Sequence, residues 1–353
     1  MSVVILKPDE IGDFLLATGA IRLLAAKHGE ANTTLVVKKD IAPLVQREFP
    51  RARCIELPLQ TRVKGHNLAA ANIVHCFPVW LRLCSLRTDD VVCLRTRRDF
   101  LQTLFFASPG AARRFASENV LLRSGRMRRR WAENLLRQVR RPVIIPYPPL
   151  GTGMPAELAS FRTVVSAALE REVAPAEVMP SLLSAPWRGG PDWLLCPFSS
   201  RPAKDYSVDR WAAALQQVEH LQRPRLLRLA GGPAQSERLE AFAVSLRSAG
   251  LSYPVEVQPP QPLAQFPDLV SQAGLVLTVD TAAAHFACAT GAPAAIVASG
   301  LHDGVYGPYS PNSRQIWLTG DWAGSGRDGW QASVTASHVA NAIGRAIGAP
   351  SGT

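Results

Sequence analysis

One segment constrains the fold of this chain more than any other. The apolar run Leu275–Val279 ends abruptly at Asp280, and residues 282–290 after it predict a helix. The short, β-branched run is typical of a parallel strand buried on both faces. Asp280 and Thr281 would then lie at the helix N-terminus, at the sheet edge where α/β proteins bind ligands and where helix dipoles attract anions. The segment predicts an anion site; the alternative is a capped helix with no ligand.

A second segment has the same order of strand, loop and helix. Residues 193–196 predict a strand, and Ser199, Ser200 and Lys204 follow it before a helix that begins near Val208. Hydroxyl groups can donate hydrogen bonds to phosphate oxygens, and a lysine can neutralise the charge that develops on a leaving diphosphate. This loop therefore predicts contacts to a pyrophosphate.

The amino terminus provides a third such segment. Residues 3–7 predict a strand, residues 8–12 a turn and residues 13–26 an amphipathic helix. Asp13 would lie in the first helical turn, close to the carboxyl end of the strand. A carboxylate at that position either acts as a general base or interacts with the helix dipole.

Together the three segments resemble the hallmarks of glycosyltransferase family 9, which contains the ADP-heptose:lipopolysaccharide heptosyltransferases. The matching stretches are Ile-Leu-Lys-Pro-Asp-Glu-Ile-Gly-Asp-Phe-Leu-Leu-Ala-Thr at 5–18, Ser-Ser-Arg-Pro-Ala-Lys at 199–204 and Asp-Thr-Ala-Ala-Ala-His at 280–285. Similarity continues through 291–293 and 300–308, and more weakly through 90–116. The resemblance implies an α/β fold of the GT-B type, with two facing Rossmann-like domains and an interdomain cleft.

The resemblance also implies roles for individual residues. Asp13 would be the general base that takes the proton from an acceptor hydroxyl. The residues implied in donor binding are Ser199, Ser200, Lys204, Asp280, Thr281, Ala282 and His285. Lys7, Arg97 and Arg98 are weaker candidates for contacts to the acceptor or to phosphate.

His285 also has a purely structural interpretation, because a lone histidine on a helix is more often part of the packing. The chain has no Asp-x-Asp motif. This favours cationic side chains rather than a metal as the groups that neutralise the diphosphate. We therefore expect a metal-independent transfer that needs no cofactor, and the resemblance implies that the transfer is inverting.

Two positions depart from the family pattern. Ala282 stands where the family usually has glycine, and its methyl group either narrows the donor pocket or is accommodated. Many members carry cysteines near the position of residues 321–330, and this chain has none there. These departures bear on the identity of the donor and the acceptor more than on the fold.

The length of 353 residues exceeds a comfortable single core. We expect an acceptor-binding domain at 1–174, a Pro-, Ser- and Gly-rich linker at 175–191 and a nucleotide-sugar-binding domain at 192–333. The final helix and tail, 334–353, should pack back on the amino-terminal domain, as the resemblance implies. Predicted strands are 3–7, 34–38, 72–76, 90–94 and 142–146 in the first domain, and 193–196, 226–230, 255–257, 275–279 and 294–298 in the second.

Composition predicts a cytoplasmic protein. No apolar run approaches the ~20 residues that span a bilayer, and the amino terminus does not have the pattern of a secretory signal. Six cysteines lie at positions 54, 76, 84, 93, 196 and 288, without a Cys-x-x-Cys pair. They are expected to be reduced; a metal held by Cys76, Cys84 and Cys93 is the alternative.

The positive charge is concentrated in the amino-terminal half. Residues 1–150 contain 25 Lys and Arg against 12 Asp and Glu, and eight arginines lie between Arg123 and Arg141. Such a cluster favours a polyanionic partner, here a phosphorylated glycolipid at the cytoplasmic face of the inner membrane, with Arg128, Arg129 and Arg130 as contacts. The alternatives are nucleic acid, disfavoured by the few interleaved aromatic residues, and a solvated helix face.

The leading hypothesis is therefore transfer of heptose, or a related sugar, from an ADP-sugar to the lipopolysaccharide inner core. Two other functions remain open at this point. One is a nucleotide-sugar epimerase or hydrolase with the same fold. The other is a non-catalytic protein that binds anionic lipid or nucleic acid.

Overall fold

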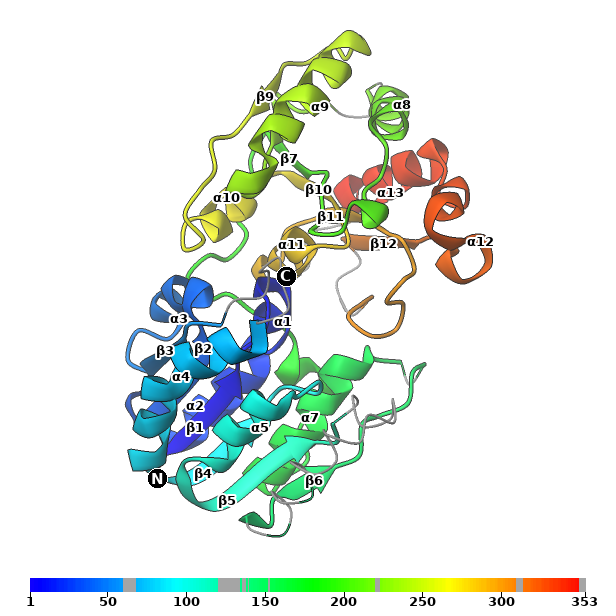
Figure 1. Ribbon diagram of the computed structural model, residues 1–353. Helices are drawn as coiled ribbons and strands as arrows, with labels where there is room; N and C mark the ends of the chain where they lie inside the picture. The colour runs from blue at the N-terminus through cyan, green and yellow to red at the C-terminus, as the bar shows by residue number, and fades with distance from the viewer. Residues whose placement is uncertain are drawn as a thin grey trace. The chain divides into compact units, whose positions relative to one another are not determined.

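The computed structural model describes residues 1–59, 68–119, 134, 138, 140–151, 153–219, 223–308 and 314–348. The chain forms two compact units, Met1–Pro180 and Ser181–Thr353. Each unit is built around a six-stranded sheet in which the paired strands are parallel (Figure 1).

The first unit has the strand order β3-β2-β1-β4-β5-β6. This is the doubly wound Rossmann order. Its strands are β1 Val3–Lys7, β2 Thr33–Lys38, β3 Arg53–Leu57, β4 Arg87–Cys93, β5 Gly110–Ser117 and β6 Val143–Ile145. Its helices are α1 Ile11–Leu16, α2 Thr18–His28, α3 Ala42–Glu48, α4 Leu68–Ser85, α5 Phe100–Ala107 and α7 Ala156–Leu169, with short 3-10 turns η1 Glu30–Asn32, η2 Lys39–Ile41 and η4 Pro175–Val178. The central strand β1 is buried along its whole length, as its apolar sequence predicts.

The second unit repeats this topology. Its sheet runs β12-β11-β10-β7-β8-β9, which is the same order when the strands are counted from β7. The strands are β7 Trp193–Cys196, β8 Leu227–Leu229, β9 Val255–Val257, β10 Leu275–Val279, β11 Ala294–Ala298 and β12 Gln315–Thr319. The helices are α8 Val208–Val218, α9 Ser236–Ser248, α10 Phe266–Gln272, α11 Ala282–Thr290, α12 Trp322–Gly329 and α13 Ala336–Gly348, with 3-10 turns η5 Pro202–Lys204, η6 Pro233–Gln235 and η7 Trp330–Ala332.

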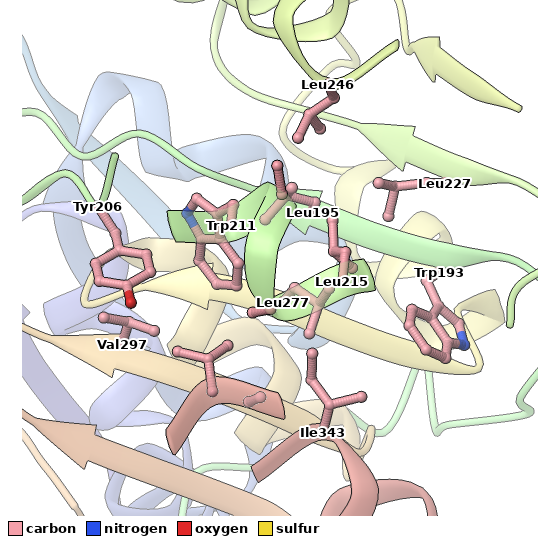
Figure 2. Packing of buried hydrophobic residues seen from close by; sticks show 14 of the residues in the cluster. Trp193, Leu195, Tyr206, Trp211, Leu215, Leu227, Leu246, Leu277, Val297 and Ile343 are labelled. Carbon is pink, nitrogen blue, oxygen red and sulfur yellow. The ribbon is translucent and has the colours of Figure 1, made fainter. Parts of the chain in front are cut away.

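One large apolar cluster forms the core on one face of the second sheet. Figure 2 shows Tyr206 and Trp211 at one end of it and Trp193 at the other, with Leu215 and Leu277 between them. The Tyr206 and Trp211 rings meet edge to face, with centroids 5.4 Å apart. Each large side chain buried in such a cluster stabilises the fold by about 1.5–3 kcal/mol.

Helix α13 packs within the second unit. Its buried residues, which include Val339 and Ile343, belong to the core of this unit, and the helix packs on α8, β11 and β12. Figure 2 shows Ile343 facing this core. The apolar stripe of α13 thus helps to cover the sheet of its own unit.

The boundary between the units falls inside the range predicted as linker, but that range is not a free connection. η4 packs on α2, where a Cβ on Gly19 would overlap the carbonyl oxygen of Met179. On the other side of the boundary, the Leu182 N–H donates to the Ala289 carbonyl at 2.8 Å. Trp187 donates its backbone N–H to Thr290 at the same distance. The segment is therefore tied to both units by backbone contacts.

Most predicted strands are present in the structure. One predicted strand is absent, and three strands of the structure were not predicted. Residues 72–76, predicted as a strand, lie inside α4. Short apolar runs do not distinguish a strand from a helix, and the β-branched pair Ile73-Val74 biased the choice. The sequence analysis missed β3, β5 and β12. β3 and β12 are edge strands, and β5 carries Arg113 and Arg114, so none of the three shows the continuous apolar pattern of a central strand.

No helix in the described part of the chain is both long enough and apolar enough to cross a membrane.

Candidate functional site

Two predicted donor-site residues meet at the carboxyl edge of the second sheet. β7 and β10 are parallel neighbours, with Cys196 opposite Thr278, so the loops that follow them leave the sheet side by side. In this arrangement Lys204 Nζ lies 2.6 Å from Asp280 Oδ2. The two side chains are only 11% and 12% exposed. The structure therefore brings together residues from two of the three segments singled out in the sequence.

His285 lies one turn into α11 and is buried. Burial lowers its pKa to about 4, while the negative charge of Asp280 acts in the opposite direction and Lys204 adds to the lowering. The ring is therefore uncharged at neutral pH. It can donate or accept a hydrogen bond next to the Lys204–Asp280 pair, but it does not supply a second positive charge.

The first turn of α11 borders the same edge. Thr281 is the N-cap, with extended backbone angles of φ −147° and ψ −178°, and its side chain makes no capping hydrogen bond. Thr281 and Ala282 are both partly exposed. The amino end of α11 thus presents backbone N–H groups and a partial positive charge close to Lys204.

The two serines of the preceding loop differ in what they do. Ser199 is buried; its hydroxyl donates to the Arg201 carbonyl at 2.6 Å and accepts from the Arg201 N–H at 3.0 Å. Its hydroxyl hydrogen thus shapes the loop, and a hydrogen bond from Ser199 to a phosphate stays a prediction. Ser200, the next residue, is exposed at the tip of the loop.

Sequence reasoning missed the residues that hold this loop in place. Asp205 accepts the Ser199 N–H at 2.7 Å through Oδ1 and pairs with Arg238 Nη2 at 2.7 Å through Oδ2. The Arg201 guanidinium lies 3.2 Å from His302 Nε2. The only signal for His302 was the family similarity at 300–308.

A small hollow adjoins Asp280. Its cavity volume is about 10 Å³, and its lining is Asp280, Ala298, Gly300, His302, Asp303, Tyr306, Gly307, Trp317 and Thr319. This lining combines hydrogen-bond donors and acceptors with aromatic rings. Larger hollows lie at the opposite edge of this sheet, lined for example by Asp192 and Arg225, so size alone does not locate the site.

In the first unit, Asp13 lies in the first turn of α1, where it was predicted. Burial raises the pKa of its carboxyl to about 6; the charge of Lys7 opposes this shift, and the charge of Glu157 adds to it. A carboxylate with a pKa near 6 accepts a proton more readily than an ordinary aspartate and is still ionised at neutral pH.

Lys7, at the end of β1, is buried next to this group. Its Nζ lies 2.8 Å from Asp9 Oδ2 and 4.7 Å from the centre of the Phe161 ring. Burial lowers the pKa of Lys7, whereas the nearby carboxyl groups of Asp13 and Glu157 raise it. Lys7 therefore lies among acidic groups in the interior rather than at the surface.

The two arginines after β4 have different environments. Arg97 is exposed, but Arg98 is buried, with Nη1 donating to the Arg95 carbonyl at 2.9 Å. The Arg98 side chain packs inside the unit, and its contact to an acceptor stays a prediction. Arg95, which sequence reasoning missed, contacts Asp9 and donates to the Pro8 carbonyl at 3.2 Å.

The predicted surface arginines Arg128, Arg129 and Arg130 lie outside the described residues. None of the six cysteines forms a disulfide bond in the structure. Among the residues that the structure describes, no group of three or more His, Cys, Asp and Glu side chains is arranged to hold a metal.

One family model matches part of the chain. Residues 162–327 match the glycosyltransferase family 9 (heptosyltransferase) model. No curated protein sequence matches the chain.

The chain also resembles several solved structures. The Escherichia coli heptosyltransferase WaaC with ADP has a TM-score of 0.69 at 17% identity, covering 97% of this chain and 99% of that one. A family 9 glycosyltransferase from Veillonella parvula has a TM-score of 0.65 at 14% identity, covering 98% and 97%. For the Escherichia coli ADP-heptose lipopolysaccharide heptosyltransferase II the values are 0.64 and 14%, covering 98% of each chain. These similarities establish the fold class as GT-B.

Proposed function

We propose that this chain is a heptosyltransferase of glycosyltransferase family 9, a proposal supported by the match of residues 162–327 to that family's model. It moves heptose, or a related sugar, from an ADP-sugar to the inner core of a lipopolysaccharide. The transfer inverts the anomeric carbon and needs no metal ion.

The observation that carries this proposal is the position of Lys204. Its ammonium group is held by Asp280 at the carboxyl edge of the sheet, close to the half-exposed start of α11. A diphosphate bound there would interact with a lysine charge and with helix N–H groups, which together stabilise the charge of a leaving nucleoside diphosphate. Thr281, the partly exposed N-cap of this helix, lies next to Asp280 and would face hydroxyl or phosphate oxygens of the donor.

Asp13 serves as the base in the proposed reaction. Its carboxylate takes the proton of the acceptor hydroxyl while that oxygen attacks the anomeric carbon of the donor. The bond from this carbon to the diphosphate oxygen breaks, and ADP leaves with the bonding electrons. A single displacement of this kind inverts the anomeric configuration. The raised pKa of Asp13 supports this role, because proton transfer is most effective when the base has a pKa near the working pH.

Two further features support the proposed partners. One related structure contains ADP and another contains ADP-2-deoxy-2-fluoro heptose, both bound to Escherichia coli WaaC. The excess of basic residues in the first 150 positions fits a phosphorylated glycolipid acceptor at an anionic membrane surface, where the enzyme would act as a peripheral cytoplasmic protein.

The test is a turnover assay with ADP-heptose, ADP-glucose and UDP-glucose, each with and without a phosphorylated inner-core glycolipid. Release of ADP from ADP-heptose that depends on the acceptor, together with a heavier glycolipid by mass spectrometry, supports the proposal. ADP release without acceptor would indicate a hydrolase instead. Isomerised sugar nucleotide would indicate an epimerase. Absence of any turnover would favour the non-catalytic alternative.

A further inference from the structure

Helix α4 carries two apolar stripes, and only one of them faces the core. Cys76 and Leu83 belong to the apolar cluster of the first unit, and Val79 and Trp80 pack against it. These positions follow the i, i+3, i+4, i+7 spacing of one helix face. They account for how α4 is held on the sheet.

The second stripe points to solvent. Val74, Phe77 and Leu81 are 70%, 51% and 50% exposed, and Pro78 is exposed between them. These residues repeat the same spacing, two positions out of step with the first stripe. At 100° per residue the offset is about 200°, so the two stripes lie on opposite sides of the helix.

This outward stripe is unusual within the described part of the chain. It contains three of the eight large apolar side chains that are exposed there. Scattered exposed apolar residues are normal, but a contiguous apolar face on one helix indicates an interaction surface. The Phe77 ring also lies 5.5 Å from the Trp80 ring, centroid to centroid, which links the outward face to the residues that anchor the helix.

The polar residues of α4 suit an anionic partner. The helix contains no Asp or Glu. His75 and Arg82 are one heptad apart, both exposed, and border the outward stripe on the same side. The surrounding first 150 residues carry about twice as many basic as acidic side chains. An apolar stripe with a basic border and no acid is the pattern of a helix that lies in a membrane interface.

We infer that the outward face of α4 is a membrane-docking surface, which inserts Val74, Phe77, Pro78 and Leu81 among the lipids of an anionic bilayer while Arg82 contacts the headgroups. A long arginine side chain can extend from the edge of such a stripe to the headgroup level. The inference concerns binding to the bilayer itself and does not depend on the proposed transfer reaction.

The experiment measures binding of the full chain to two kinds of vesicle, pure phosphatidylcholine and a 7:3 mixture with phosphatidylglycerol. The test variant combines Phe77→Gln and Leu81→Gln, because glutamine keeps helix propensity while removing the apolar groups. The matched control combines Leu183→Gln and Val244→Gln, two apolar residues of the second unit that are 69% and 57% exposed. Both variants remove two exposed apolar side chains.

We expect the parent and the control to bind the mixed vesicles equally and the test variant to bind at least about tenfold more weakly. The test variant has less apolar surface to transfer from water into the bilayer. Arg82→Glu should weaken binding to the mixed vesicles only. Circular dichroism and thermal unfolding identify any variant that fails to fold, and Val74→Gln is then the replacement.

Two results would overturn the inference. One is equal vesicle binding by parent and test variant, or no vesicle binding by the parent. The other is a parent dimer in light scattering that the test variant converts to a monomer, which would assign the face to a second copy of the chain. ADP affinity and sugar transfer are measured in parallel; loss of transfer with vesicle binding intact would count against the proposed function alone.

Discussion

The Lys204 ammonium group and the Asp280 carboxylate are joined at 2.6 Å by two loops that leave adjacent parallel strands. Because both side chains are nearly buried, removing one would leave the other with little solvation. A diphosphate that binds Lys204 must therefore either share the lysine with Asp280 or displace the Asp280 carboxylate from it. The ion pair fixes the position of the lysine at this edge of the sheet.

Lys204→Ala should weaken binding of ADP and of the sugar nucleotide alike. Loss of one charge-assisted hydrogen bond costs about 1–3 kcal/mol, which corresponds to a rise of roughly 5- to 150-fold in Kd. Isothermal titration with ADP measures the change. Arg345→Ala, which removes an exposed cation from α13, is the control and should leave Kd unchanged. Equal ADP affinity in Lys204→Ala and parent would place the diphosphate elsewhere.

Asp13→Asn should keep ADP binding and lower turnover by roughly 10²–10⁴-fold, the usual contribution of a positioned base. In the parent, kcat/KM should rise with pH and level off above about 6, because the base is active only when ionised. The variant should lack this rise. A folded Asp13→Asn protein with near-normal turnover would remove Asp13 from the catalytic role.

Glu157→Gln should shift the acidic limb of that pH profile to lower pH. The negative charge of Glu157 helps to raise the pKa of Asp13, and a glutamine removes the charge but can still accept the 2.6 Å hydrogen bond from Thr96. Glu10→Gln is the matched control, because the charge of exposed Glu10 raises the Asp13 pKa less than that of Glu157 does. If the acidic limb of the pH profile of Glu157→Gln is not shifted, the charge of Glu157 does not help to set the pKa of Asp13.

His285 should make the fold less stable in acid. Burial lowers its pKa from 6.5 to about 4, so between these values the unfolded chain holds more protons than the folded chain. The free energy of unfolding therefore falls as pH decreases through this window, by on the order of 2 kcal/mol between pH 7 and pH 5. Urea unfolding of the parent and of His285→Gln measures the difference. Identical pH slopes in the two proteins would contradict the prediction.

Charge reversal of Arg128, Arg129 and Arg130 to glutamate should weaken binding to anionic vesicles by roughly two orders of magnitude, since each basic residue near such a surface contributes about 1 kcal/mol at best. Binding should also become less dependent on salt, while ADP affinity stays constant. The measurements are vesicle sedimentation and the acceptor KM. If vesicle binding and the acceptor KM are both unchanged and binding of nucleic acid is lost instead, the arginine cluster binds nucleic acid rather than anionic lipid.

The sequence predicted most of the architecture because the central strands have a recognisable sequence pattern. Runs such as Val3–Lys7 and Leu275–Val279 are short, apolar and followed directly by polar residues, as expected of strands buried on both faces. The edge strands β3 and β12 face water on part of their surface and lack that pattern. The segment at 72–76 was assigned to the wrong element because α4 is apolar on two sides, which removes the helical period from a short window.

Part of the site was predictable for the same reason. Parallel strands bring the residues that follow them to one edge, so the proximity of Lys204 to Asp280 follows from the order of strands and loops. The hydrogen bonds between Ser199 and Arg201 depend on the exact path of the loop, which no sequence pattern specifies. The burial of Arg98 was also unpredictable, because a charged residue is exposed by default unless its partners are known.

The packing of α13 in the second unit has a consequence for how the chain folds during synthesis. The first unit has all six strands of its sheet by Ile145 and is complete at Pro180. The core of the second unit needs Val339 and Ile343, so it cannot close until those residues have been made. Domains fold as units while the chain emerges from the ribosome. Until then, part of the apolar face of the second sheet stays uncovered. The nascent chain is prone to aggregation during that interval.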